Sequence, residues 1–468
     1  MSRYVILISI LLVPIIFLVL FITGVITPKT VAPKRVQLTM WTTTDDPAVF
    51  TSILKRYQAI RPYISISIEK VTSDDYTSLL KDAWARGKGP DIFELPASSI
   101  GEFAADFIVP VPKTTNVYTY YSKKVLFRTD VTIKQTAIPS VTLPQLESDF
   151  AYVVSEDVVR DGNIYGFPLS LDTLVLYYNK DILRSANIAE PPKTWTQLAA
   201  IAPRLSIADE QGKLLQSAIA IGRGSNVNHA ADIISLLFMQ DGVNMNSNGK
   251  VLLDESTGDD DTTVLGVNAL SYYASFASPS KAVYSWNKDQ PQSLDAFMRG
   301  KTAMYIGYNA DRTTIETQSS INLGIAPMLH LQEDGKDAMF TAAGNPMQVN
   351  YGDYHVYSVF QRSAHPQEAW NFVQYMTKQA DVASLYLTAT RKIGALTSIL
   401  AKQANDPEIG TQAQQAISAR SWYHGTGATS AMRTLTTMLD NVADGTTSPL
   451  EALTLARKQI ELTTITKK

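Results

Sequence analysis

The 468-residue sequence contains no cysteine. A chain without cysteine has no disulfide bonds, no thiolate metal site and no cysteine nucleophile, and it cannot carry a lipid on an N-terminal cysteine. Its five histidines are scattered, which leaves little material for a histidine-rich metal centre. We therefore predict neither a metal ion nor a cofactor.

Charge is also scarce, and it is balanced. Charged residues make up 18% of the sequence, against roughly 25% in an average soluble domain. The formal net charge of −3 argues against a nucleic-acid-binding surface over the whole chain. With 45% hydrophobic residues, the chain is able to bury large cores and is not expected to be disordered.

Common catalytic motifs are missing as well. The sequence contains no G-x-S-x-G, H-E-x-x-H or G-x-x-x-x-G-K-[ST] pattern. The acidic pairs at 45–46 and 74–75 are adjacent residues, not carboxylates opposed across a cleft, so glycosidase chemistry finds no specific support. The acidic run at 259–261 lacks the spacing of a calcium loop and is expected to cap the following helix. We predict that the protein is not an enzyme.

One long apolar run lies near the N-terminus. Residues 4–26 carry no charge, and about 20 apolar residues suffice for a helix to cross a bilayer. The apolar core of a cleaved signal peptide is shorter, roughly 7–15 residues, and a small-x-small site follows it. The nearest such stretch here is interrupted by Pro28. We predict an uncleaved transmembrane helix at 4–26, with cleavage as the alternative, and a proline-stiffened linker over 27–35.

The body that begins at residue 36 alternates between strand and helix patterns. Strand patterns cover 36–41, 64–68 and 91–95, and helix patterns cover 50–59 and 76–86. Strands separated by helices indicate a parallel sheet, in which ligands lie beyond the carboxyl ends of the strands. The loops 41–46 and 94–99 are therefore candidate binding edges. Residues 113–150 are polar and lack a clean period, so we interpret them as an insertion or a long connection.

Several segments of the body resemble the extracellular solute-binding proteins of the maltose-binding type, the receptors of ABC importers. They occur in the family's order: GKGPDIFELPASSIGEFAADFIVPVP at 87–112, GFPLSLDTLVLYYNKDILRSANIAEPPKTWTQL at 166–198, SLDAFMRGKTAMYIGYNADRTTI at 293–315, DYHVYSVFQRSAHPQEAWNFVQYMT at 353–377, TATRKIGAL at 388–396, and ARSWYHGTGATSAMRTLTTMLDNVADGTTSPLEALTLARKQI at 419–460. The segment at 166–198 is the most specific, because its proline-led strand ends in Tyr-Asn-Lys-Asp and Pro-Pro-Lys-Thr-Trp opens the next helix.

The resemblance implies an α/β, two-lobed periplasmic-binding-protein type II fold with the ligand cleft between the lobes. The predicted N-terminal lobe covers 36–166 and 328–377, the predicted C-terminal lobe covers 168–326 and 380–468, and the chain crosses near 166–168, 325–327 and 377–379. The resemblance also implies a monomeric substrate-binding subunit for a carbohydrate-like solute, with an ABC permease in the same membrane as its partner. It places the body outside the cytoplasm, although the basic residues after the apolar run mildly favour a cytoplasmic C-terminus.

Candidate ligand residues follow predicted strands or lie between predicted helices. Sugar recognition uses carboxylates and amides that bond adjacent hydroxyls, and aromatic faces that cover the apolar side of the ring. The candidates are Trp41, Asp45, Glu94, Ser98, Asp172, Trp286, Tyr308, Asn309, Trp422 and Tyr423. By resemblance, Asp172 matches the position of a ligand-binding carboxylate in the family. The alternatives are core packing for the tryptophans, helix capping for Asp45, a solvated edge position for Glu94, and a helix cap or hinge hydrogen bond for Asp172.

The sequence departs from the maltodextrin-binding members of the family. Those members carry Trp, Asp and Arg just after the third strand, where this chain has Leu95, Ser98 and Ser99. Their tryptophan after a Gly-Pro pair is absent from the region 307–311. We therefore expect another saccharide, a polyol or a sugar phosphate. A membrane-tethered sensor or surface scaffold is the alternative function, motivated by the predicted anchor and the insertion at 113–150.

Overall fold

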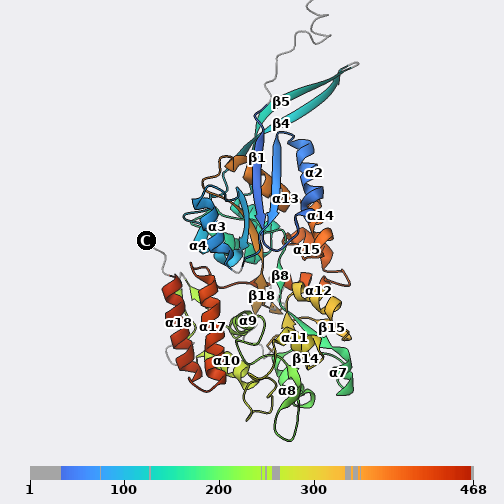
Figure 1. Ribbon diagram of the computed structural model, residues 1–468, viewed down its shortest axis with the longest axis vertical. Helices are drawn as coiled ribbons and strands as arrows, with labels where there is room; N and C mark the ends of the chain where they lie inside the picture. Colours follow the sequence, from blue (N-terminus) through green and yellow to red (C-terminus); the bar gives the residue numbers. More distant parts are fainter. Residues whose placement is uncertain are drawn as a thin grey trace, which may run out of the picture.

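The computed structural model describes two α/β lobes that are stacked along the long axis of the molecule and joined by short crossing strands (Figure 1). The described residues are 33–73, 75–125, 128–243, 245–247, 250–255, 264–331, 339–340, 346–347 and 349–464. The predicted transmembrane helix at 4–26 lies outside them. Within these ranges, no helix has the length and apolarity that a membrane span requires.

The first lobe is built on a four-stranded sheet with the order β19-β3-β1-β2. Its strands are β1 (Val36–Thr42), β2 (Ile64–Lys70), β3 (Ile92–Pro96) and β19 (His355–Val359). β1 runs parallel to β2 and β3, whereas β19 is antiparallel to β3. The three strands predicted from the alternating pattern are thus confirmed. Because β1 and β3 are parallel neighbours, their carboxyl ends meet at one edge of the sheet.

Helices pack around this sheet and bury their apolar faces against it. They are α2 (Thr51–Ile60), α3 (Tyr76–Ala85), α4 (Ile100–Phe103), α5 (Leu143–Asp149), α6 (Tyr152–Val158), α13 (Pro366–Lys378), α14 (Ala380–Thr390), α15 (Thr397–Gln403) and α16 (Gly410–Ala416), with 3₁₀ turns η1 (Pro47–Phe50) and η2 (Ala97–Ser99). The predicted helices over 50–59 and 76–86 correspond to α2 and α3.

The second lobe contains a five-stranded mixed sheet with the order β10-β11-β14-β9-β15. Its strands are β9 (Val175–Asn179), β10 (Ile207–Ala208), β11 (Leu214–Ile219), β14 (Thr302–Gly307) and β15 (Leu323–Ala326). The surrounding helices are α7 (Lys180–Ser185), α8 (Trp195–Leu205), α9 (Ala230–Gln240), α10 (Leu265–Ser275), α11 (Ser293–Met298), α12 (Asn309–Gln318), α17 (Ala428–Ala443) and α18 (Pro449–Thr464). Short strand pairs at β6–β7 (Val159–Arg160, Asn163–Ile164), β12–β13 (Asn246–Ser247, Lys250–Val251) and β16–β17 (Met339–Phe340, Pro346–Met347) lie outside the main sheets.

Three short strands connect the lobes, in the order β20-β18-β8. They are β8 (Asp172–Thr173), β18 (Asn350–Asp353) and β20 (Ala419–Arg420). The first core contains most of the buried residues that precede β8, those from Tyr354 to Leu400 and those from Ala413 to Ala419. The second core contains most of the buried residues from Leu174 to Tyr351 and those from Trp422 onward. Among the described residues, Met328, Leu329 and Tyr351 pack in the second core and the buried residues from Val382 to Ala419 pack in the first, whereas the sequence-based lobes place 328–351 in the first lobe and 380–419 in the second.

The region around 113–150 forms a long two-stranded ribbon, β4 (Thr114–Val125) and β5 (Arg128–Pro139), followed by α5. The ribbon projects from the end of the first lobe that lies away from the crossing strands (Figure 1). Its base is fixed to the lobe: Val117 is buried, the Tyr118 N–H donates to the Tyr63 hydroxyl at 3.0 Å, the Tyr120 ring stacks on the Tyr63 ring, and the Asn371 amide donates to Thr115 Oγ1 at 3.0 Å.

Trimming the outer part of this ribbon is expected to leave the fold and solute binding unchanged. Replacing residues 121–132 with an Asn-Gly turn keeps Tyr118 and Tyr120, which pack against the first core, so the free energy of unfolding should change by less than about 1 kcal/mol. Thermal unfolding measures this change. The matched control removes 114–139 and with it buried Val117, which should cost about 1.5–3 kcal/mol. Equal losses in both variants would contradict the structural assignment of the base.

Candidate ligand-binding site

A cavity of about 520 Å³ lies at the junction of the two lobes, beside crossing strands β8 and β18. The first lobe contributes the loop after β1, the end of β3 and the segment that links α14 to α15, while the second lobe contributes the start of α12. The lining residues are Thr44, Asp45, Glu94, Leu169, Ser170, Leu171, Asp172, Asn309, Ala310, Thr313, Asp353, Tyr354, His355, Tyr357, Tyr386, Thr390, Lys392 and Ile393. The cavity therefore has walls from both lobes, at the edge where the carboxyl ends of β1 and β3 meet.

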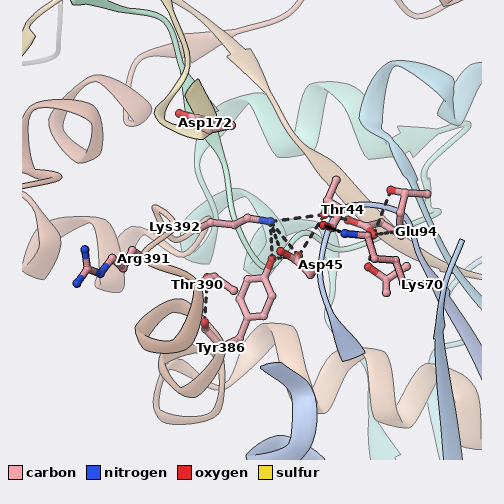
Figure 2. Close-up of polar contacts among 12 residues, drawn as sticks. Thr44, Asp45, Lys70, Glu94, Asp172, Tyr386, Thr390, Arg391 and Lys392 are labelled. Atoms are coloured by element: carbon pink, nitrogen blue, oxygen red, sulfur yellow. Dashed lines mark hydrogen bonds and ion pairs between the residues drawn. The ribbon is translucent and has the colours of Figure 1, made fainter. Parts of the chain in front are cut away.

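Glu94 fixes the loop after β1. Its carboxylate is 2% exposed and accepts hydrogen bonds from Thr42 Oγ1 at 2.6 Å, from the Thr43 N–H at 2.6 Å and from Thr44 Oγ1 at 3.1 Å. These bonds join neighbouring strands β1 and β3 where both strands end (Figure 2). Glu94 thus orders the threonine loop at the cavity wall.

Asp45 lies in the same loop and is neutralised by Lys392. The ammonium group is 2.7 and 2.8 Å from the two carboxylate oxygens, and the Tyr386 hydroxyl donates to Asp45 Oδ2 at 2.6 Å (Figure 2). Burial, reinforced by the negative charge of Asp45, raises the pKa of Tyr386 well above its usual range, so its hydroxyl stays protonated. The helix cap considered for Asp45 belongs instead to Asp46, which accepts from the Ala48 N–H.

Sequence reasoning missed both Lys392 and Tyr386. The motif at 388–396 was a signal that this segment belongs to the fold, but it does not indicate which of its side chains faces the cavity. In Figure 2 the Arg391 guanidinium points away from Asp45, while Lys392 reaches toward it. Arg391 has a left-handed backbone conformation with φ of 56° at the end of α14, which reverses the chain between these two side chains.

Asp172 links a crossing strand to the second lobe. Its carboxylate accepts the backbone N–H groups of Thr173 at 2.9 Å and of Asn309 and Ala310 at 3.2 Å each. The last two belong to the first turn of α12, where free N–H groups favour a negative charge. Burial nevertheless raises the pKa of Asp172 to about 7 against the lowering effect of these donors, with a further upward contribution from Asp353.

Four of the ten candidate residues come together in the cavity: Asp45, Glu94, Asp172 and Asn309. The other six lie elsewhere. Half-buried Trp41 packs against the first core and half-buried Ser98 lies in η2. Trp286 and Tyr308 are buried in the second core, where Tyr308 donates to Asp232 Oδ2 at 3.0 Å.

Trp422 and Tyr423 are also buried in the second core. The Trp422 indole N–H donates to Ser235 Oγ at 3.1 Å, and the Tyr423 hydroxyl lies 2.8 Å from Thr463 Oγ1. Trp422 also lines a second cavity of about 340 Å³, whose wall includes Glu156 of the first lobe and His424. The structure thus separates this aromatic pair from the cavity that holds Asp45 and Asp172.

Trp286→Ala is expected to lower the free energy of unfolding by about 3–5 kcal/mol, because Trp286 is fully buried. Trp286→Phe keeps most of the ring but loses the N–H bond to Asn226 Oδ1 at 3.0 Å, and should cost about 1–2 kcal/mol. Denaturant unfolding measures both values. A Trp286→Ala protein with unchanged stability and abolished solute binding would show that this side chain contacts the ligand instead.

Two polar atoms in the cavity wall lack protein partners. The Tyr357 hydroxyl, on a residue that is 2% exposed, and Asn309 Oδ1 are buried without a hydrogen bond to any described residue. Buried polar groups in native proteins are nearly always paired, so unpaired ones in a cavity wall indicate a place for a polar ligand. Metal coordination has less support, since no group of three His, Asp or Glu ligands gathers among the described residues.

Comparison with known proteins gives one family match and several relatives. The family model described as "Bacterial extracellular solute-binding protein" matches residues 41–383. The chain is 23% identical over 366 residues to the maltotriose-binding protein of Pyrococcus abyssi (strain GE5 / Orsay), covering 77% of this chain and 65% of that protein. It is 40% identical over 72 residues to the maltodextrin-binding protein MdxE of Bacillus subtilis (strain 168), covering 15% and 16% of the two chains. Both matches span less than two thirds of the relative's length.

A solved structure shares the fold. A cyclo/maltodextrin-binding protein complexed with maltotetraose superposes with a TM-score of 0.68 at 18% identity, over 93% of this chain and 99% of that chain. Identity at this level carries the two-lobed architecture but not the ligand. The class of ligand that this chain binds therefore has to be inferred from the residues that line the cavity and not from the structural similarity.

Proposed function

Because the chain belongs to the family of bacterial extracellular solute-binding proteins, we propose that it is the substrate-binding subunit of an ABC importer that takes up a carbohydrate-like solute. The family match covers most of the chain, and the family and its solved relatives are solute-binding proteins and not enzymes. The single observation that supports the proposed site is the 520 Å³ cavity with walls from both lobes. Its carboxylates, amide and hydroxyls suit a polyhydroxylated solute.

Closure of the lobes over the solute is the proposed mechanism. The first turn of α12, in the second lobe, meets Asp172 on the crossing strand through two backbone N–H groups, so the relative position of the lobes determines the shape of the cavity. A ligand that converts a 1:99 mixture of closed and open forms to 99:1 must bind the closed form more tightly by about 5.5 kcal/mol. Several buried hydrogen bonds from both lobes are able to supply that difference.

The proposed membrane arrangement follows from the sequence. Residues 4–26 would anchor a monomeric body outside the cytoplasm, beside a permease in the same membrane, with 27–35 as linker. The body would consist of two lobes with crossings at 172–173, 352–353 and 420–421, as the cores indicate. Alkaline washing of membranes tests the anchor: the full chain should stay in the membrane fraction and a variant lacking 4–26 should be released. Release of both would contradict the anchor.

The β4–β5 ribbon favours a second candidate function, a membrane-tethered sensor or scaffold. The ribbon projects away from the crossing strands, where a partner has access to it without touching the cavity (Figure 1). A variant trimmed of residues 121–132 distinguishes the two functions. An importer subunit should retain solute uptake in cells after trimming, whereas a sensor or scaffold that uses the ribbon should lose its partner while still binding solute.

A thermal-shift screen of the purified chain tests solute binding itself. A ligand at 100 times its Kd stabilises the folded state by about 2.7 kcal/mol, which moves the unfolding midpoint by several degrees. The proposal predicts a selective shift with one class of saccharide. Shifts with amino acids or peptides, and none with saccharides or polyols, would contradict a carbohydrate-binding function while leaving the family assignment intact.

A further inference from the structure

Two carboxylates face the cavity from neighbouring crossing strands. Asp172 on β8 lies directly opposite Asp353 on β18 in the antiparallel register, and both residues line the cavity. Directly opposed residues in such a pair have Cβ atoms about 4.5–5.5 Å apart, and like charges in these positions destabilise the pair. A counter-charge between them would offset that cost.

The described part of the protein supplies no cation to this pair. Lys392, which lines the same cavity, is held by Asp45 at 2.7 Å. The ring of His229 is bound to Asp311 at 3.0 Å, and His355 in the cavity wall forms no ion pair with either carboxylate among the described residues. Asp353 itself is exposed toward solvent and has no hydrogen bond or ion pair with any described residue.

A third carboxylate adds to the negative charge. Asp232 on α9 accepts the Tyr308 hydroxyl, and its pKa is raised to about 7 by burial and by its proximity to Asp353. The pKa of Asp172 is raised by the same two causes. Both acids are thus perturbed by burial and by the neighbouring Asp353, and perturbed acids of this kind gather where ligands bind.

Independent of the acids, the same wall contains unpaired polar atoms. The Tyr357 hydroxyl and Asn309 Oδ1 are buried without partners among the described residues. The hydroxyl is able to donate to a ligand oxygen, and the amide oxygen is able to accept from a ligand hydroxyl. The same cavity therefore offers hydrogen-bonding sites for hydroxyl groups and a pair of carboxylates that has no cationic partner among the described residues.

We propose that the solute carries an ammonium group, as an amino sugar does, and that this group binds between Asp172 and Asp353. The proposal rests on the carbohydrate-binding function proposed above and narrows its substrate class. When both carboxyls are ionised, closure of the lobes around a neutral sugar would leave two opposed negative charges without a cation in a less hydrated site, which is costly. A sugar phosphate would add a further negative charge, so the cavity selects against that class.

The affinity for an ammonium-bearing solute should depend on pH, and the pKa of Asp172 determines the direction of the change. Below pH 7 this carboxyl is partly protonated in the free protein, and an ammonium group favours its ionised form. Binding of the ammonium solute therefore releases a proton, and its affinity should rise with pH between 5.5 and 7, by up to about tenfold per unit. A neutral sugar, which does not select the ionised form, should show a flatter profile.

Calorimetric titration of the full chain with matched sugars tests the proposal. The probes are glucosamine against glucose, galactosamine against galactose, and glucose 6-phosphate, each at pH 5.5 and 7. We expect one amino sugar to bind at least tenfold more tightly than its neutral counterpart, with affinity rising with pH. Asp353→Asn should remove most of the preference for the amino sugar. Its thermal unfolding midpoint should rise, because the repulsion between the two carboxylates is lost, and a cooperative transition shows that the variant folds.

The outcomes separate the two proposals. A neutral sugar that binds as tightly as its amine, or more tightly, overturns the ammonium site and leaves carbohydrate binding intact. Tight binding of glucose 6-phosphate, which carries negative charge and no ammonium group, also overturns the ammonium site. No binding by either amine or neutral sugars overturns both the site and the proposed function. An amine preference that Asp353→Asn does not alter overturns the assignment of the group to this pair of carboxylates.

Discussion

Asp172→Ala is expected to weaken solute binding by about 30-fold or more, which corresponds to 2 kcal/mol or more. The substitution removes a carboxylate from the cavity wall and, with it, the acceptor for the backbone N–H groups of Asn309 and Ala310. The second lobe then loses two hydrogen bonds to the crossing strand, so closure should weaken together with direct contact to the solute. Calorimetric titration with the solute identified by the thermal-shift screen measures the change.

A matched carboxylate separates this effect from a general loss of charge. Asp46→Ala removes an exposed acid next to Asp45 that caps η1 through the Ala48 N–H and does not line the cavity. It should lower stability by about 1 kcal/mol and leave the Kd unchanged. If Asp46→Ala weakens binding as much as Asp172→Ala does, or if Asp172→Ala binds the solute normally, Asp172 has no specific role in solute binding.

Lys392→Ala should cost about 2–4 kcal/mol of folding stability. Asp45 is 8% exposed, and the lysine ammonium is its cationic partner at 2.7 Å. Removing one partner of a buried pair leaves an uncompensated charge, which costs about 3–5 kcal/mol in a fully buried site. The lysine side chain is 31% exposed, so solvent reduces that cost. Denaturant unfolding at pH 7 provides the measurement.

A double-mutant cycle identifies the source of this loss. Asp45→Asn in the Lys392→Ala background removes the uncompensated charge and should restore much of the stability. Lys70→Ala is the control, because the Lys70 ammonium is bonded only to the exposed Thr44 carbonyl at 2.8 Å, and should cost less than about 1 kcal/mol. Equal losses from the two lysine substitutions, with no recovery in the double variant, would rule out a charge-pair role.

The regular parts of the fold were predictable because their signal is local. Alternation in 64–68 places Ile64 and Ile66 on one face of β2, and both are buried. The β4–β5 ribbon gave no such signal, since a two-stranded ribbon outside the lobe has no face that must be apolar throughout. The short strands β8, β18 and β20 gave no signal either, because strands of two to four residues are too short for a period to show.

The candidate site was predictable only where a single segment determines it. Asp45, Glu94 and Asp172 each follow or begin a strand, so their own neighbours in sequence place them at the cavity. Lys392 reaches Asp45 across 347 positions, which only the tertiary fold decides. Trp286 was predicted as a ligand residue but packs in the second core. A tryptophan that packs in a core and one that covers a sugar ring cannot be told apart from the sequence alone.

The most direct test of the central claim is the distance between the lobes with and without solute. The absence of cysteine from the chain allows a clean pair of spin labels at Thr317→Cys on α12 and Thr388→Cys on α14, both exposed positions on elements that flank the cavity. Pulsed electron paramagnetic resonance should show a broad distance distribution that narrows and shortens when a binding saccharide is added. A distribution that stays the same at saturating saccharide would contradict closure of the lobes around the solute.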